Sequence, residues 1–138
     1  MPTFAEVEVG TELPAQEFQL KRDNLVRYAG ASGDFNIIHW NERVAKSVGL
    51  PNVIAHGMLT MATAGRVVTD WAGDPGKVLS YGVRFSSPVV VEDDDQGATL
   101  SVAGVVEEKN DDGTVVVGLT VTVGEKKVLM GAKAVVKL

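Results

Sequence analysis

The chain has 138 residues, of which 45% are hydrophobic and 22% are charged, and its formal net charge is −5. This length and composition predict one globular domain, spanning residues 1–138, that can bury a core of its own. Because the chain has no cysteine, a disulfide scaffold, a thiolate zinc site and a cysteine nucleophile are all excluded. The acidic balance lacks the clustered cations that nucleic acids require, so we expect no nucleic-acid partner.

The N-terminal residues show no sign of export. Residues 1–6 lack the basic stretch and following apolar core that mark a secretory signal. No apolar run approaches the roughly 20 residues that cross a bilayer. We therefore expect a cytoplasmic protein with no membrane partner.

The front half of the chain predicts helices. One helix is expected over residues 23–31, ended by Gly33 in left-handed backbone, and Asn41 is suited to cap a short helix that reaches residue 48. The main helix is expected over residues 56–71, and its few polar positions predict that most of it is buried. Its apolar residues are Met58, Leu59, Met61, Ala62, Ala64, Gly65, Val67, Val68 and Trp71.

The back half of the chain changes to alternating and β-branched residues, which is typical of strands. The loops at residues 109–113 and 124–126 are suited to hairpin connections. A mostly antiparallel sheet of about five strands, curled around one long helix, is the simplest way to bury both. The strands are expected at residues 17–20, 78–85, 98–108, 114–123 and 127–136.

The most informative polar cluster lies where the first expected helix ends. Asp34, Asn36 and His39 bring a carboxylate and an imidazole within side-chain reach of each other. A histidine can gain or lose a proton near neutral pH. An acid–base pair that brackets one water suits the addition of water to a carbon–carbon double bond, or its removal. Asn36 could orient that water or the aspartate.

A second polar cluster, His56 and Gly57, begins the main helix. A free backbone N–H at a buried helix start can hold the negative charge that builds on a carbonyl oxygen during such a reaction. Gly57 has no side chain to obstruct a substrate at this amide. Each cluster also has a plainer interpretation, because Asp34 and Asn36 suit an ordinary turn and His56 suits a helix cap.

Together the two clusters resemble the MaoC-like family of (R)-specific enoyl thioester hydratases and dehydratases. The segment from Tyr28 to His39 resembles the family's hydratase motif, and the segment from Ile54 to Met61 looks like the start of its central helix. The likeness extends over nearly the whole chain. Within the family, the chain looks closest to the B subunit of the actinobacterial (3R)-hydroxyacyl-ACP dehydratase, where ACP is acyl carrier protein. That closer likeness is carried by His39-Trp40, Ala55–Met61 and Trp71–Gly76.

The resemblance implies an α+β hot-dog fold, in which a long central helix is wrapped by an antiparallel sheet and two such sheets join in a dimer. It implies that Asp34 and His39 handle the proton and the catalytic water, that Asn36 supports them, and that the Gly57 amide holds the thioester oxygen. No metal and no redox cofactor is implied. The substrate would be an acyl thioester of CoA or of ACP, whose pantetheine arm threads between the protomers of a homodimer or of a heterodimer with a related subunit.

Ile37 departs from the family pattern, which usually has proline at this position. Isoleucine is bulkier and leaves a backbone N–H, so the loop could be less rigid than in the family. The polar residues on either side are intact, so we still expect a competent site.

Several functions fit this resemblance. The first is (3R)-hydroxyacyl-ACP dehydration in type II fatty acid elongation of the mycolic-acid type, and the second is hydration of enoyl-CoA in fatty acid degradation or polyhydroxyalkanoate supply. A non-catalytic subunit that binds acyl chains or stabilises a partner is a different class, and thioester hydrolysis is a further possibility. A basic rim for an anionic carrier is as plausible as ordinary surface charge at Lys21, Arg22, Arg27, Arg43 and Lys46.

Overall fold

The computed structural model describes all 138 residues. The expected helices and four of the five expected strands are confirmed, with ends that agree within one residue. The α-helices are α1 (Arg22–Ser32), α2 (Glu42–Ser47) and α3 (Gly57–Ala72), and two short 3₁₀ helices are η1 (Ile37–His39) and η2 (Pro75–Lys77). The strands are β1 (Glu12–Leu20), β2 (Val78–Phe85), β3 (Ala98–Lys109), β4 (Thr114–Val123) and β5 (Lys126–Lys137).

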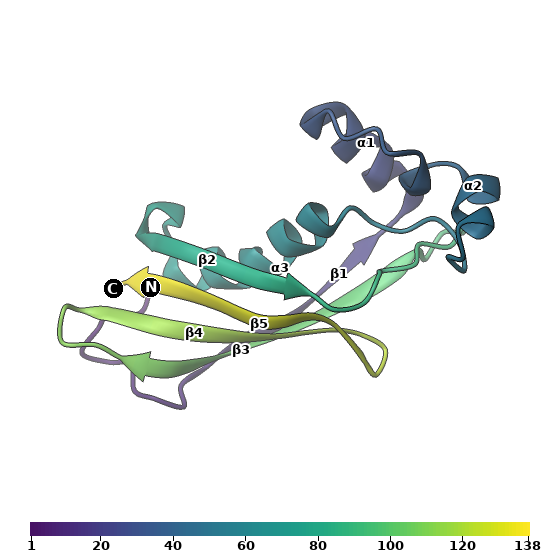
Figure 1. Cartoon of the computed structure of the whole chain (residues 1–138). Coiled ribbons are helices and arrows are strands. Elements are labelled where there is room, and N and C mark those ends of the chain that lie inside the picture. The colour runs from purple at the N-terminus through teal and green to yellow at the C-terminus, as the bar shows by residue number, and fades with distance from the viewer.

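The five strands form one antiparallel sheet in the order β1-β3-β4-β5-β2. The sheet lies along one side of α3, while α1 and α2 stand beyond the start of that helix (Figure 1). This arrangement confirms the α+β hot-dog architecture, a central helix wrapped by an antiparallel sheet. It leaves β1 and β2 as the two edges of the sheet.

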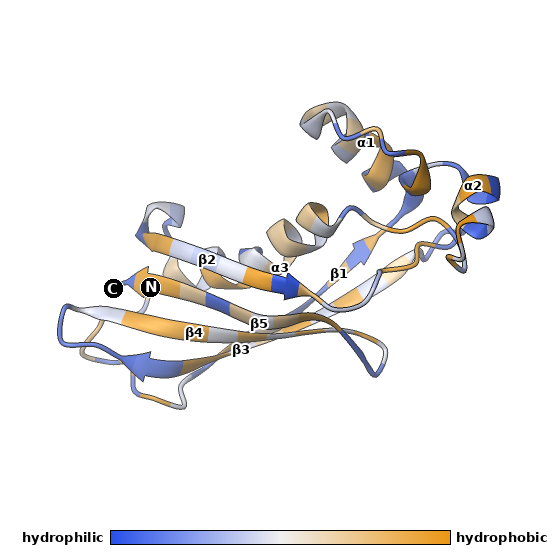
Figure 2. Cartoon of the chain, in the orientation of Figure 1, coloured by the Kyte–Doolittle hydropathy of each residue, from blue (hydrophilic) through white to orange (hydrophobic).

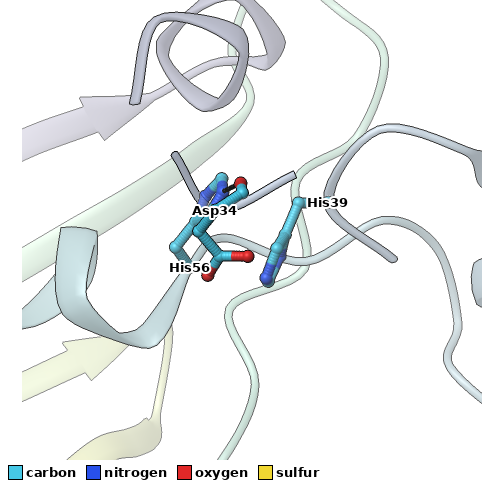
Figure 3. A group of neighbouring side chains, drawn as sticks. All are labelled: Asp34, His39 and His56. Carbon is cyan, nitrogen blue, oxygen red and sulfur yellow. Dashed lines mark hydrogen bonds between the residues drawn. The ribbon is translucent and has the colours of Figure 1, made fainter. Parts of the chain in front are cut away.

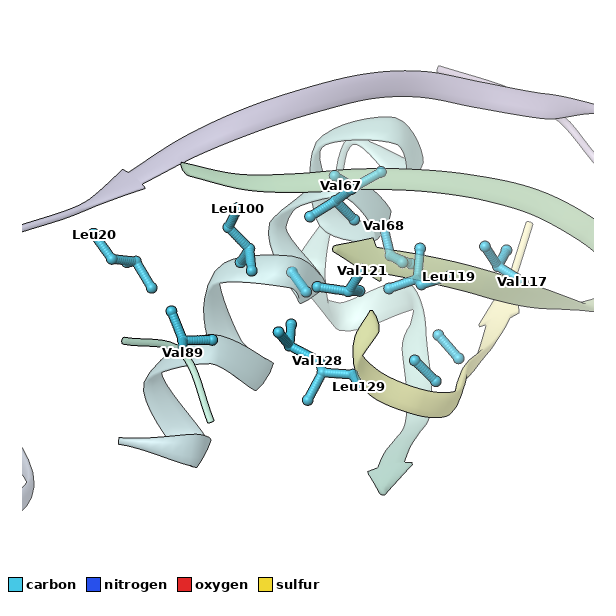
Figure 4. Packing of buried hydrophobic residues seen from close by; sticks show 14 of the residues in the cluster. Leu20, Val67, Val68, Val89, Leu100, Val117, Leu119, Val121, Val128 and Leu129 are labelled. Carbon is cyan, nitrogen blue, oxygen red and sulfur yellow. The ribbon is translucent and has the colours of Figure 1, made fainter. Parts of the chain in front are cut away.

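The core lies between the sheet and α3. Every second residue of β4 is buried, as a strand with one face on a core requires. Val67 and Val68 of α3 are 1% exposed and belong to the same cluster (Figure 4). Each fully buried side chain of this size contributes about 1.5–3 kcal/mol relative to exposure. The alternating β4 residues are Val115, Val117, Leu119 and Val121.

Strand β1 is longer than the sequence predicts. The expected strand covered residues 17–20, whereas β1 begins at Glu12. Residues 12–16 were not predicted as strand because Pro14 cannot donate a hydrogen bond to a neighbouring strand, and proline is rare within sheets. Here β1 is an edge strand, and its register with β3 shifts between Leu13 and Gln16, so the ladder tolerates the proline.

The prediction that most of α3 is buried is wrong. Only six of its sixteen residues are buried, two of them are the polar residues Thr60 and Thr63, and Met58 is 55% exposed. The sheet covers one side of the helix, which carries apolar residues along much of its length (Figure 2), and of these Met58 and Ala62 remain exposed. Sequence periodicity cannot show which apolar face has a partner within the same chain.

None of the helices combines the length and the apolar character needed to cross a membrane.

Candidate active site

Local side-chain hydrogen bonds shape the loop that carries Asp34. Gly33 ends α1 at φ 75°, and its N–H donates to the carbonyl of Ala29 over 2.9 Å. The Asp34 carboxylate then accepts the N–H of Asn36 at 3.1 Å, and the Asn36 side-chain oxygen accepts the N–H of Ile38 at 3.3 Å. The turn interpretation is therefore correct. It leaves open the role of Asn36 toward water, which stays a prediction.

His39 lies at the end of η1 with one ring nitrogen fixed. The residue is 8% exposed, and its Nδ1 lies 2.6 Å from the carbonyl oxygen of Ile54. A carbonyl can only accept, so Nδ1 carries the hydrogen and Nε2 of the neutral ring keeps a free lone pair. Burial lowers the pKa of His39 below its ordinary value, and the contact with Ile54 and the Asp34 carboxylate partly oppose this effect. His39 is thus a neutral proton acceptor at pH 7.

His56 joins this pair, which brings the two polar clusters of the sequence together in one site. It occupies the N-cap position of α3, but its side chain makes no capping hydrogen bond. Instead its ring stacks on His39 with centroids 3.8 Å apart, and its Nε2 lies 3.0 Å from the main-chain oxygen of Asp34. The three side chains meet at one point (Figure 3). In the sequence, the one indication of this contact is that each of the two histidines lies in a polar cluster at the edge of an apolar segment.

A cavity of about 260 Å³ opens beside His39 and the start of α3. Gly57 lines this cavity and its N–H meets no acceptor in the chain, so its role toward a thioester oxygen stays a prediction. Asp34 is exposed beside the cavity and does not line it. The other lining residues come from α3 and the segment before it, from the end of β2 and the segment after it, and from β5: Ile54, Ala55, Thr60, Phe85, Ser86, Ser87, Pro88, Val89, Val128 and Leu129.

Asp34, His39 and His56 are also close enough to suggest a metal site, since one ligand atom of each lies within 4.8 Å of the others. The stacked rings argue against a shared ion. Their planes differ by only 23° and their centroids are 3.8 Å apart, so each free lone pair lies in its own plane and an ion about 2.0–2.1 Å from both nitrogens would have to sit well out of both ring planes. The geometry therefore favours proton transfer over metal binding.

The residues expected to form a basic rim are largely neutralised. Arg22, Arg27 and Lys46 each lie within ion-pair distance of a carboxylate of α1 or α2. Arg22 also donates to a main-chain carbonyl over 2.6 Å and is directed inward. Lys21 and Arg43 form no ion pair, so they are the cations of this set that remain for an anionic carrier.

Comparisons with known proteins agree with the fold. A family profile described as MaoC like domain matches residues 5–127, so the chain belongs to the MaoC-like family. A solved structure titled MaoC-like dehydratase superimposes with a TM-score of 0.95 and 42% identity, over 99% of this chain and 42% of that chain.

Two curated relatives are named as hydratase or dehydratase. The chain is 38% identical to 3-hydroxyacyl-thioester dehydratase X of Mycobacterium tuberculosis, over 56% of this chain and 27% of that protein. It is 32% identical to the (R)-specific enoyl-CoA hydratase of Rhodospirillum rubrum, over 84% of this chain and 78% of that protein. The chain thus spans about a quarter of the first relative's length and most of the second's.

Proposed function

We propose that this chain is a hydro-lyase that interconverts (3R)-hydroxyacyl and trans-2-enoyl thioesters. One observation carries the proposal: the neutral His39, fixed through Nδ1 and next to the Asp34 carboxylate, lines the same cavity as the open Gly57 amide. An acid–base pair and a hydrogen-bond donor for a thioester oxygen are the two parts that this chemistry needs.

In the hydration direction, Asp34 and His39 hold one water above C3 of the enoyl group. His39 Nε2 accepts a proton of this water while its oxygen bonds to C3, and the electron pair of the double bond moves through C2 onto the thioester oxygen. The Gly57 N–H and the positive end of α3 stabilise this oxygen. A proton then returns from the pair to C2. Dehydration is the reverse, and neither direction needs a metal or a redox cofactor.

We propose dehydration of (3R)-hydroxyacyl-ACP in type II fatty acid elongation, including the mycolic-acid type, as the physiological direction. The likeness to a mycobacterial 3-hydroxyacyl-thioester dehydratase supports it. Hydration of enoyl-CoA is the second candidate, because the relative named (R)-specific enoyl-CoA hydratase matches this chain over the greater length. Turnover of matched ACP and CoA thioesters distinguishes the two.

We further propose that the working unit is a dimer joined at β2, with an identical or a related subunit. The outer edge of β2 has no strand partner, and its residues Leu79 and Phe85 are 61% and 55% exposed. Met58, at the start of α3, is another exposed apolar side chain. The pantetheine arm of the substrate would then pass between the two protomers. Native mass spectrometry of the purified chain, alone and with candidate partners, gives the subunit count.

Two other functions predict different products. A non-catalytic acyl-binding subunit would turn over no thioester, although it has no need of Asp34 beside a neutral His39. A thioesterase would direct water at the carbonyl carbon and release free thiol.

The test is the absorbance of crotonyl-CoA and crotonyl-ACP, followed together with thiol release. We expect loss of the enoyl signal without free thiol, and formation of the (3R)-hydroxy product. Thiol release that keeps pace with substrate loss would favour hydrolysis. No turnover, alone or with any hot-dog partner, would reject the proposed function.

A further inference from the structure

His56 is a buried titratable group that the proposed chemistry does not use. It is 1% exposed, and it lies against Asp34 from the loop, His39 from η1 and Tyr28 from α1. No lysine, arginine or glutamate forms a hydrogen bond or an ion pair with it. A buried imidazole without an ion partner is costly to retain for packing alone, since an apolar ring could fill the same space.

The contacts of His56 fix its tautomer. Its Nε2 faces the main-chain oxygen of Asp34 at 3.0 Å, and because that oxygen can only accept, Nε2 carries the hydrogen. Its Nδ1 is buried and has no hydrogen-bond partner. A second proton there would leave a buried N–H without an acceptor, on a cation stacked 3.8 Å from His39. In the neutral ring the hydrogen therefore lies on Nε2, the opposite tautomer to that of His39.

The bond from His56 is also the tether of the Asp34 loop. Residues 33–36 otherwise form hydrogen bonds only with residues 28–40, through short local turns. The contact from His56 to Asp34 is the one that joins this loop to the helix that carries Gly57. The same ring covers the flat face of His39 (Figure 3). His56 thus contacts both Asp34 and His39, and it is the residue directly before Gly57.

We propose that His56 is a positioning residue, which holds the Asp34 main chain through Nε2–H and sets the ring plane of His39 by stacking. The inference rests on the proposed function and adds a residue to it. His56 acts through its two neighbours and touches no reacting atom. Its loss should therefore lower kcat more than it raises KM, because substrate contacts remain while the pair loses its alignment.

A matched pair of amide variants tests the tether. The amide of His56→Gln can reach the place of Nε2 and donate to Asp34, whereas the amide of His56→Asn has the same chemistry but ends one bond short. We expect His56→Asn to lower kcat about 10²-fold with little change in KM, and His56→Gln to remain within about tenfold of the wild type. Equal kcat values for the two variants, or wild-type kcat in His56→Asn, would overturn the inference.

A second measurement needs no variant and no turnover. With only two histidines in the chain, ¹⁵N imidazole shifts at pH 7 report both tautomers directly. We expect hydrogen on Nδ1 of His39 and on Nε2 of His56. Hydrogen on Nδ1 of His56 with none on Nε2 overturns the inference even if the variants do not fold. An inactive wild type rejects the proposed function and positioning with it, whereas an active wild type with the wrong tautomer rejects the inference alone.

Discussion

The sheet core and the Asp34 loop are held together by different interactions. Val115, Val117 and Val121 are fully buried between the sheet and α3, and the removal of their apolar surface from water stabilises the fold. The Asp34 loop is exposed and is held by single hydrogen bonds, each of which contributes about 0.5–1.5 kcal/mol. The fold can therefore survive changes that disable the site, and the site can remain intact in a weakened fold.

The largest expected effect is on activity alone. Asp34→Asn and His39→Asn should each lower turnover of crotonyl thioester by about 10²–10⁴-fold, because each removes one member of the acid–base pair. Both substitutions keep a polar group for the local hydrogen bonds, so the thermal unfolding midpoint should change little. The control is Glu107→Gln, which removes an exposed carboxylate of β3 outside the cavity. Full activity in either site variant would contradict the assignment.

The opposite effect is expected in the core. Leu100 of β3 is fully buried and does not line the cavity, so Leu100→Ala should lower the free energy of unfolding by about 2–5 kcal/mol. Activity per folded molecule should stay near that of the wild type. Urea denaturation and an assay below the transition give the two quantities. A stable but inactive Leu100→Ala protein would show that core and site are coupled after all.

Gly57→Ala should lower the stability of the fold slightly and the activity more. The added Cβ would lie 3.0 Å from Cε1 of Phe85, which is 55% exposed and can move away. The methyl group would nonetheless stand beside the amide that faces the cavity, so we expect kcat/KM to fall by roughly tenfold to 10²-fold. Gly30→Ala is the control, because a Cβ there meets nothing within 4 Å. Similar kcat/KM values for Gly57→Ala and Gly30→Ala would mean that the Gly57 amide takes no part in catalysis.

The pH profile of hydration sharpens the assignment of His39. Burial lowers the pKa of this imidazole, so its neutral form persists below the ordinary value of 6.5. As pH falls, kcat/KM should decline only when Nε2 takes up a proton, with a midpoint below 6.5. Stopped-flow absorbance with crotonyl-CoA between pH 5 and 8 measures this limb. A decline that begins above pH 7 would mean that His39 is easier to protonate than its buried position implies.

The smallest effect concerns Ile37 and favours stability. It is the first residue of η1, its N–H meets no acceptor, and Asn36 already has the extended ψ of 126° that precedes proline. Ile37→Pro should therefore raise the free energy of unfolding by about 0.4–1 kcal/mol by restricting the unfolded chain, with activity retained. Scanning calorimetry detects the change. A lower unfolding temperature would show that the isoleucine side chain contributes packing that proline cannot replace.

Sequence patterns predicted the elements well because those patterns are local. Alternation marks a strand with one buried face. Asn41 marks a helix start because its side chain accepts a nearby N–H, and Gly33 marks a helix end because it adopts left-handed backbone. The same reasoning failed at Pro14, where edge position decided the outcome, and at Met58, whose burial depends on what else covers α3.

By itself the sequence determined the helix boundaries and those of every strand except β1, the family resemblance and the candidates Asp34, His39 and Gly57, because short-range chemistry and motif order are written along the chain. Only the tertiary structure decided that His56 stacks on His39 and bonds to Asp34, that Asp34 stands beside the cavity, and that Arg22, Arg27 and Lys46 of the expected basic rim are paired. These features depend on where distant segments meet, and no spacing along the chain encodes a distance between them.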